Sequence, residues 1–256
     1  MTELLVPPGS SVTPESAGWS YVGFEPLEIT AGDPVQRDTG PRECCVVVIA
    51  GRVDLSSEHG DWRGLGGRAT PFGGAPDAAY LPPGTRFTLS GAGELGLCFA
   101  PAERGAEPRV LPAASVLPET RGHGAHERTV NPILMGDEQA EALLVCEVHT
   151  PAGHWSSYPP HKHDRDALPD ESLLEETYYF RVHPEQGFGL QRVYTADRSL
   201  DETLTVRDRD TVVVPRGYHT VSAPPRYTLY YLNVMAGPAR EWAVANDPDH
   251  EWTLEP

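Results

Sequence analysis

The sequence predicts an all-β protein with two barrels in one chain. Its apolar segments are short, rich in β-branched and aromatic residues, and separated by turn signals, a pattern typical of sandwiches and barrels. The five clearest segments cover residues 44–49, 143–148, 177–182, 211–214 and 229–234. Helical periodicity is weak, and its best window, near residues 137–142, is short.

Glycine and proline separate the expected strands. They number 25 and 26 among the 256 residues, a turn-rich composition that still leaves 39% hydrophobic residues for a folded core. The clearest turn signals lie at residues 66–67, 73–74, 82–84, 197–199 and 215–217. This spacing predicts frequent turns between short strands.

The two halves of the chain repeat one plan: an acid, an apolar strand, a glycine, a spacer, a Pro-x-Gly element and a further strand. Its members are Glu43, Gly51 and Pro82-Pro83-Gly84 in the first half, and Glu176, Gly187 and Pro215-Arg216-Gly217 in the second. One supersecondary plan used twice predicts two domains. We expect them at residues 1–110 and 111–256, joined within the proline-punctuated segment 101–118.

Charge and cysteine usage limit the partners and the compartment. The formal net charge is −17, from 20 Lys and Arg against 37 Asp and Glu, which argues against nucleic acid or an anionic membrane as partner. No apolar run approaches the roughly 20 residues of a spanning helix, and we find no signal peptide. The four cysteines, Cys44, Cys45, Cys98 and Cys146, lack CxxC spacing and are interpreted as core residues. We therefore expect a reduced, cytoplasmic protein.

Three histidines and a glutamate in the second half form a candidate metal site. His161 and His163 follow the rigid Pro159-Pro160 pair and share one strand face, because side chains two apart point the same way. Glu176 opens the next strand, and His219 follows the Pro-x-Gly turn. Three imidazoles and one carboxylate suit a divalent ion such as Mn, Fe, Co, Ni or Zn. The sequence predicts one such ion, bound by these four residues.

Glu175 is the alternative to Glu176 as the carboxylate ligand. Glu176 is preferred because strand alternation then places Tyr178 and Phe180 on the same inward face. These two rings would give the metal an aromatic wall.

The first half repeats the acid and the Pro-x-Gly element of this site but lacks its histidine ligands. No histidine precedes His59, so Glu43 has no His-x-His upstream, and Phe87 occupies the candidate position for the fourth ligand. We expect the N-terminal domain to be metal-free and to act in packing or oligomerisation.

The pattern of His-x-His, Glu and a Pro-x-Gly element before a fourth ligand resembles the cupin superfamily. Longer stretches are similar to the 5-deoxy-glucuronate isomerase family of bacterial inositol catabolism: residues 131–134, 155–164, 175–179, 187–188, 191–195, 197–202 and 230–237. The resemblance covers most of the chain and is densest in residues 150–240. One departure is His154, where asparagine is expected before Trp155-Ser156-Ser157; it could alter the rim of the pocket.

The resemblance implies two cupin barrels and a metal-dependent aldose–ketose isomerase with a small sugar acid as substrate. It converts 5-deoxy-glucuronate to 5-dehydro-2-deoxy-gluconate, using a divalent ion to polarise the carbonyl and a positioned base to move a proton. Arg192 is the first candidate for binding the substrate carboxylate, with a surface ion pair as the alternative. Tyr178 and Tyr230 are candidates for contacting hydroxyls, and Glu175 is a candidate base if it is not buried against the scaffold. We expect a homo-oligomer.

Three other functions stay open at this point. A metal-dependent dioxygenase or decarboxylase would use the same fold, and an isomerase could act on another uronate. A sugar-binding protein of two cupin domains would bind without turnover. Oxygen consumption would distinguish the first, and the absence of turnover the last.

Overall fold

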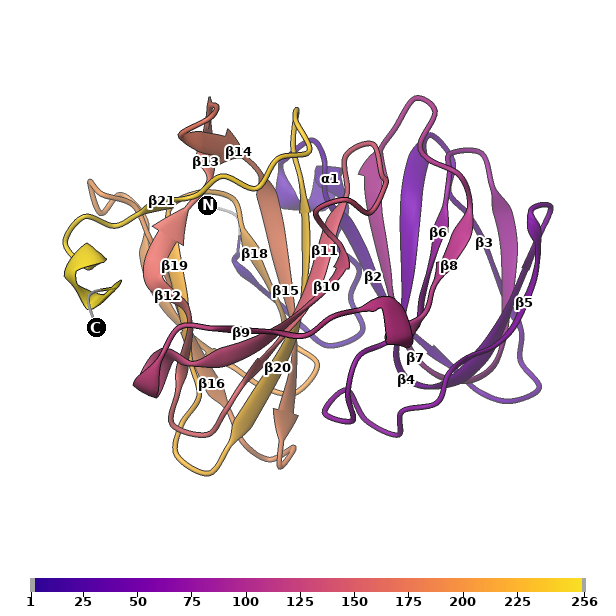
Figure 1. Ribbon diagram of the computed structural model, residues 1–256, viewed down its shortest axis with the longest axis horizontal. Helices are drawn as coiled ribbons and strands as arrows, with labels where there is room; N and C mark the ends of the chain where they lie inside the picture. Colours follow the sequence, from indigo (N-terminus) through magenta and orange to yellow (C-terminus); the bar gives the residue numbers. More distant parts are fainter. Residues whose placement is uncertain (1–2, 255–256) are drawn as a thin grey trace.

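The computed structural model describes residues 3–254, so the first two and last two residues of the predicted domains lie outside the described part. Two β-barrels lie side by side (Figure 1), which confirms the predicted all-β class. Helical segments are short: α1 (Pro14–Ala17) and the 3-10 turns η1 (Ala113–Ser115), η2 (Gly124–His126) and η3 (Glu251–Leu254). Within residues 3–254 none is long and apolar enough to cross a membrane.

The N-terminal barrel is built on two long strands that pair over their whole length. Its strands are β2 (Gly23–Ile29), β3 (Val35–Asp38), β4 (Arg42–Ser57), β5 (Gly60–Gly66), β6 (Ala78–Leu81), β7 (Arg86–Pro101) and β8 (Arg109–Leu111). One apolar cluster includes Cys44, Val46, Leu89 and Phe99. Phe87, at the position corresponding to a ligand, is buried in this cluster.

The C-terminal barrel has two sheets that curve around a common interior. The seven-stranded sheet has the order β1-β18-β15-β20-β11-β10-β9 and the five-stranded sheet β17-β16-β19-β12-β21. The first comprises β1 (Leu5–Val6), β9 (Glu119–Arg121), β10 (Arg128–Leu134), β11 (Leu144–Thr150), β15 (Glu175–His183), β18 (Thr211–Val214) and β20 (Thr228–Ala236). The second comprises β12 (Trp155–Lys162), β16 (Gly189–Tyr194), β17 (Asp201–Val206), β19 (Tyr218–Ser222) and β21 (Ala245–Asn246), and a hairpin of β13 (Asp164–Ala167) and β14 (Glu171–Leu173) extends from it.

The chain crosses from the N-terminal barrel to the C-terminal barrel between β8 and β9. β8 pairs with β6 of the N-terminal sheet, and β9 pairs with β10 of the C-terminal sheet. The connection therefore runs through residues 112–118, within the expected segment. The short strand β1 differs from the expectation, because it pairs with β18 of the C-terminal barrel. The segment at 137–142 forms turns and bends between β10 and β11.

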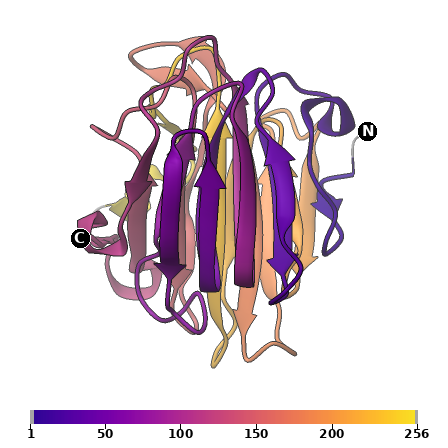
Figure 2. The same ribbon diagram turned by 90° about the vertical axis from the view of Figure 1, so that its right-hand side faces the viewer.

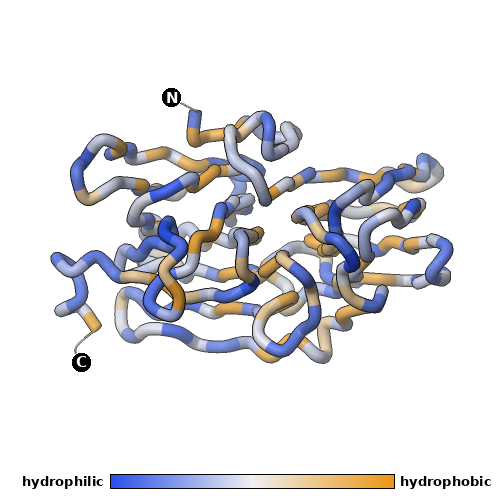
Figure 3. The backbone as a smooth tube through the Cα atoms, turned by 90° about the horizontal axis from the view of Figure 1, so that it is seen from above, coloured by the Kyte–Doolittle hydropathy of each residue, from blue (hydrophilic) through white to orange (hydrophobic). Residues whose placement is uncertain are grey.

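The barrels pack through sheet faces that lie one behind the other in Figure 2. Gly96 of β7 lies against Leu232 of β20, and a Cβ atom at Gly96 would lie 2.6 Å from the Leu232 Cδ2 atom. Arg68 of the N-terminal domain forms a bidentate pair with Glu147 of β11, at 2.8 Å for each bond, and both side chains are buried. Hydrophobic stretches of backbone lie in both barrels in Figure 3, and β4, β7, β15 and β20 are each buried over seven or more successive residues, as expected for strands covered on both faces.

Two glutamates at equivalent places hold the barrels together through backbone amides. The Glu175 carboxylate, at the start of β15, accepts hydrogen bonds from the amides of residues 20–22 at 2.6, 2.7 and 2.9 Å. The Glu43 carboxylate, near the start of β4, accepts from the amides of residues 141–143 at 2.8, 2.6 and 2.6 Å. In the internal repeat Glu43 is therefore equivalent to Glu175, and not to Glu176 as the sequence pattern suggested. The position equivalent to Glu176 is the buried Cys44.

Candidate metal centre

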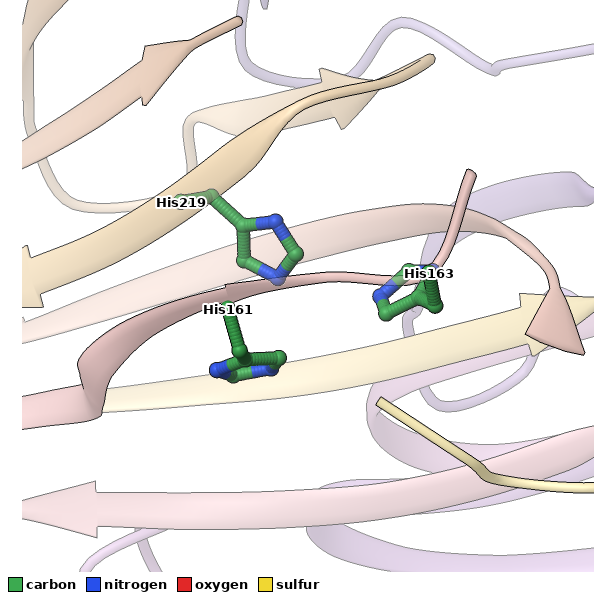
Figure 4. Close-up of side chains that lie close together, drawn as sticks. All are labelled: His161, His163 and His219. Atoms are coloured by element: carbon green, nitrogen blue, oxygen red, sulfur yellow. The ribbon is translucent and has the colours of Figure 1, made fainter. Parts of the chain in front are cut away.

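Three histidines converge in the interior of the C-terminal barrel. His161 lies near the end of β12, His163 follows that strand, and His219 lies on β19. Their rings point toward a common space in Figure 4, with ring centroids 4.7 Å apart for His161 and His219, and 5.1 Å for His163 and His219. One ligand nitrogen of each ring lies within 4.8 Å of the others. This is the only histidine, cysteine and carboxylate cluster of its kind found in residues 3–254.

Glu176 completes the cluster from the facing sheet. Its Oε2 atom lies 3.1 Å from Nε2 of His163 and 3.1 Å from Nε2 of His219. The predicted alternation along β15 is present: Tyr178 and Phe180 also face the interior, with their rings stacked 6.1 Å apart. The structure thus brings together all four residues that the sequence singled out as ligands.

Backbone carbonyls orient the three imidazoles. The Nδ1 atom lies 2.9 Å from the Leu174 carbonyl oxygen in His163, and 3.2 Å from that of Gly217 in His219. In His161 the corresponding distance to the Pro159 carbonyl is 3.4 Å. When Nδ1 donates to a carbonyl, Nε2 keeps its lone pair for a metal. The buried Nε2 of His219 has no partner of hydrogen-bond geometry within the described chain, so the donor set fits a divalent ion.

The turn before His219 requires a glycine. Gly217 has φ of 91°, and a Cβ atom there would lie 2.6 Å from the Tyr194 carbonyl oxygen. The Gly217 amide donates to Asp164 at 2.8 Å, which fixes the turn from the side of the ligand-bearing strand. The Pro-x-Gly element therefore acts by returning His219 to the interior.

The electrostatics of the cluster favour the metal-binding protonation states of Glu176 and His161. Burial alone would raise the pKa of Glu176, but the His163 and His219 imidazoles outweigh it and lower this pKa to about 2. Burial lowers the pKa of His161 well below its ordinary value, and the other two imidazoles act in the same direction. An ionised carboxylate and a neutral imidazole are the forms that bind metals. Burial alone would lower the pKa of His163, but its hydrogen bond to Glu176 outweighs burial and raises this pKa, so an ion bound there would displace a proton.

The cluster opens into a cavity of about 280 Å³. His161, Glu176 and Tyr178 line it, so the predicted residue Tyr178 does lie beside the cluster. The Tyr178 ring centroid is 5.8 Å from that of His219, and its hydroxyl lies 3.1 Å from the Ser157 hydroxyl. Burial raises the pKa of Tyr178 well above its ordinary value, so the hydroxyl stays protonated and can donate a hydrogen bond. The volume is at the small end for ligand pockets and suits a small substrate.

Arg192 lies on the other side of its strand and does not line this cavity. The interior face of β16 carries Val193, which is fully buried and pairs with His219. Arg192 therefore faces outward, where its guanidinium pairs with Asp201 at 2.8 Å and remains 40% exposed. Its predicted alternation with Tyr194 is correct, but the face that they share is the outer one. The structure favours the alternative reading of Arg192 as a surface ion pair.

Glu175 and Tyr230 are also directed away from the cluster. The Glu175 carboxylate is occupied by the amides of residues 20–22, which is the buried arrangement that removes it as a candidate base. Tyr230 lies at the junction of the barrels, with its ring 5.5 Å from that of His149 and 5.8 Å from the Arg68 guanidinium. Both residues have the strand parity that faces the N-terminal barrel.

The sequence interpretation missed several residues of the cavity wall. Arg121, Arg128 and Tyr231 line it, and so does Cys146, whose thiol is buried. The parity of Arg128 with Val130 on β10 is the only signal that could have placed it inside. That signal is weak, because Arg128 is the first residue of its strand and belongs to no spaced motif.

His154 contacts the segment that carries part of the cavity wall. Its Nδ1 atom lies 2.9 Å from the carbonyl oxygen of Glu127, the residue before Arg128. An effect of His154 on the pocket rim stays a prediction, and this contact is the route by which it would act.

Comparison with known proteins agrees with this geometry. The model of the KduI/IolB family matches residues 7–253. The chain is 49% identical over 247 residues to a 5-deoxy-glucuronate isomerase of Geobacillus thermodenitrificans, covering 95% of this chain and 90% of that protein. It is 43% identical over 248 residues to the 5-deoxy-glucuronate isomerase of Bacillus subtilis strain 168, covering 95% and 92%.

Solved structures show the same architecture. An IolB-like protein from Salmonella typhimurium LT2 superposes with a TM-score of 0.96 at 41% identity, over 98% of this chain and 99% of that one. An oxalate decarboxylase from Lactobacillus farciminis gives a TM-score of 0.63 at 13% identity, over 92% and 82%, a likeness of fold alone. The predicted fold of two cupin barrels is confirmed, and this chain belongs to the KduI/IolB family.

Proposed function

We propose that the protein is a metal-dependent aldose–ketose isomerase that converts 5-deoxy-glucuronate to 5-dehydro-2-deoxy-gluconate in inositol catabolism. The observation that carries the proposal is the cluster of three histidines and Glu176, two of whose members, His161 and Glu176, line one small cavity. The relatives that share 43–49% of its residues bear the name of this isomerase.

His161, His163, His219 and Glu176 would hold one divalent ion. Imidazole and carboxylate donors together suit Mn, Fe, Co, Ni or Zn. When bound, such an ion supplies Lewis acidity, which polarises a substrate carbonyl and stabilises negative charge that develops on oxygen. The supporting observation is that all three Nδ1 atoms face backbone carbonyls, which directs the opposite ring nitrogens into the cluster, where Nε2 of His163 contacts Glu176.

The residues beyond the cluster would position the sugar and exclude water. The reaction moves a hydrogen from C2 to C1, as a proton or as a hydride, and it needs a substrate held still during this transfer. The protonated Tyr178 hydroxyl is suited to donate to a substrate oxygen. Ser157 lies 3.1 Å from the Tyr178 hydroxyl and 3.4 Å from that of Tyr231, so three hydroxyls form one polar site in the cavity. This role for Tyr178 is the part of the predicted catalytic set that the geometry supports.

The test follows the conversion of 5-deoxy-glucuronate by NMR, with protein loaded in turn with Mn, Fe(II), Co, Ni and Zn. The expected result is the 2-keto isomer as product, without consumption of oxygen or a nicotinamide cofactor. No conversion with any of these metals contradicts the proposal. Oxygen consumption with an aromatic substrate would instead support a dioxygenase.

Three further expectations accompany the proposed function. The N-terminal barrel, with an apolar cluster in place of a ligand set, would serve packing or oligomerisation. Assembly as a homo-oligomer and a cytoplasmic location stay predictions. Light scattering of the purified protein and fractionation of cells that express it would check them.

A further inference from the structure

Two arginines meet on the wall of the cavity that His161 and Glu176 of the cluster also line. Arg121 on β9 and Arg128 on β10 are directly opposite each other in the strand register, and both line the cavity. Like charges in opposite positions of a sheet are destabilising. The protein therefore concentrates positive charge at this site although its formal net charge is −17.

The two arginines differ in what neutralises them. Arg121 donates from Nε and Nη2 to Glu119, at 2.9 and 2.7 Å, and its guanidinium lies 5.1 Å from the centre of the Trp242 ring. Arg128 donates from Nη1 to the His126 carbonyl oxygen at 3.2 Å. Among residues 3–254 no carboxylate pairs with Arg128. Its charge is thus left for a ligand.

The surroundings of Arg128 make an unpaired charge costly. Burial lowers its pKa, and the charge of Arg121 acts in the same direction, yet a guanidinium keeps its proton in proteins. Among residues 3–254 the only carboxylate that lines the cavity is that of Glu176, which is engaged with His163 and His219. A half-buried charge without a partner is destabilising unless an anion occupies the site.

We infer that Arg128 binds the carboxylate of the substrate and makes the cavity selective for sugar acids over neutral sugars. The inference rests on the proposed function, because it assigns one end of that substrate to Arg128 and the aldehyde end to the histidine cluster. A planar guanidinium can hold a carboxylate through two parallel hydrogen bonds. Arg128 takes the role that the sequence had suggested for Arg192, whose guanidinium lies outside the cavity and is paired with Asp201.

The first experiment compares kinetics for 5-deoxy-glucuronate in Arg128→Ala, Arg128→Lys and the matched control Arg192→Ala. Loss of a charge-assisted contact lowers kcat/KM by about ten- to a hundred-fold, mostly through KM because the carboxylate is remote from the bonds that change. Lysine keeps the charge and restores part of the loss, whereas Arg192→Ala stays within about two-fold. Unchanged kinetics in Arg128→Ala, or an equal loss in Arg192→Ala, overturns the inference.

The second experiment separates this inference from the isomerase proposal. Calorimetry measures the affinity of metal-loaded protein for 5-deoxy-glucuronate and for 5-deoxy-glucose, its neutral analogue. The wild-type protein is expected to prefer the acid, and Arg128→Ala to lose at least about ten-fold of that preference with an unchanged metal content. This result supports the role of Arg128 even where no isomerisation is seen. A wild-type protein without preference, or a variant that keeps it, refutes the role and leaves the isomerase proposal to the NMR assay.

Discussion

Replacing the adjacent residues Glu175 and Glu176 by glutamine should have different consequences. Both changes keep the size of the side chain and remove its charge. Glu176 points into the C-terminal barrel, 3.1 Å from the nitrogens of two histidines, whereas Glu175 accepts three backbone amides of residues 20–22. We therefore expect one variant to lose metal and the other to lose stability.

The size of each effect follows from these contacts. Removing a residue that merely supports a ligand costs about ten- to a hundred-fold in metal affinity, so loss of the Glu176 charge should cost about a hundred-fold or more. In Glu175→Gln one oxygen can still accept, but the amide nitrogen that replaces the other leaves at least one N–H donor without an acceptor. The lost hydrogen bond lowers the free energy of unfolding by about 2 kcal/mol, which is below the upper end of the usual range because water reaches part of the site. This loss corresponds to a decrease of about 4–8 °C in the unfolding temperature of a chain of this size.

The assay measures metal content by elemental analysis and thermal unfolding by calorimetry, on metal-free and metal-loaded samples of both variants. Glu175→Gln should retain about one metal per chain and unfold at a lower temperature in both forms. Glu176→Gln should be purified with little metal and gain little stability when metal is added. Each variant is the control for the other. Metal loss in Glu175→Gln with retention in Glu176→Gln would reverse the assignment and refute the strand phasing on which the site depends.

The remaining predictions concern the histidines, Glu43, Tyr178 in the cavity and Gly96 at the barrel junction. The double variant His161→Ala/His163→Ala should lose its single metal, and retention measured by elemental analysis would disprove the ligand set. Glu43→Ala should keep the metal but unfold at a lower temperature, because the amides of residues 141–143 lose their acceptor; metal loss would contradict this. Tyr178→Phe should keep the metal and lower kcat/KM about two- to ten-fold, and unchanged kinetics would exclude its hydroxyl from substrate binding. Gly96→Val should destabilise the protein by about 1–3 kcal/mol in denaturant unfolding, because its side chain meets Leu232 at the junction; wild-type stability would mean that the barrels can shift apart.

The ligand set was predictable because each member carries a local signal. His161 and His163 have the spacing of one strand face, His219 follows a turn that only glycine allows, and Glu176 was phased by the aromatic residues after it. All of these signals act within a few residues. Short-range spacing therefore sufficed to predict a cluster whose members lie on or next to three strands of two sheets.

The proposed substrate-binding side of the cavity was harder to predict from the sequence. Arg192 and Tyr194 do share a face, as predicted, but alternation cannot tell the inner face of a strand from the outer one. The structure settles the choice, because Val193 is the residue that pairs with His219 in the interior. Arg128 escaped notice because its proposed role depends on having no carboxylate partner within residues 3–254, and this can be recognised only from its neighbours in three dimensions.

Strand β15 shows how the candidate metal centre and domain packing are linked in this chain. Glu176 and Tyr178 face the cavity, while Tyr179 between the inward positions donates its hydroxyl to Glu94 of the other barrel at 2.7 Å. Arg181 on the same outward face also pairs with Glu94. A slip of one residue in the register would exchange the two faces, and it would move the Glu176 carboxylate into the junction. The contacts of the N-terminal barrel with the outward face therefore fix the register that presents Glu176 to the histidines, which gives a barrel without ligands of its own a part in building the site.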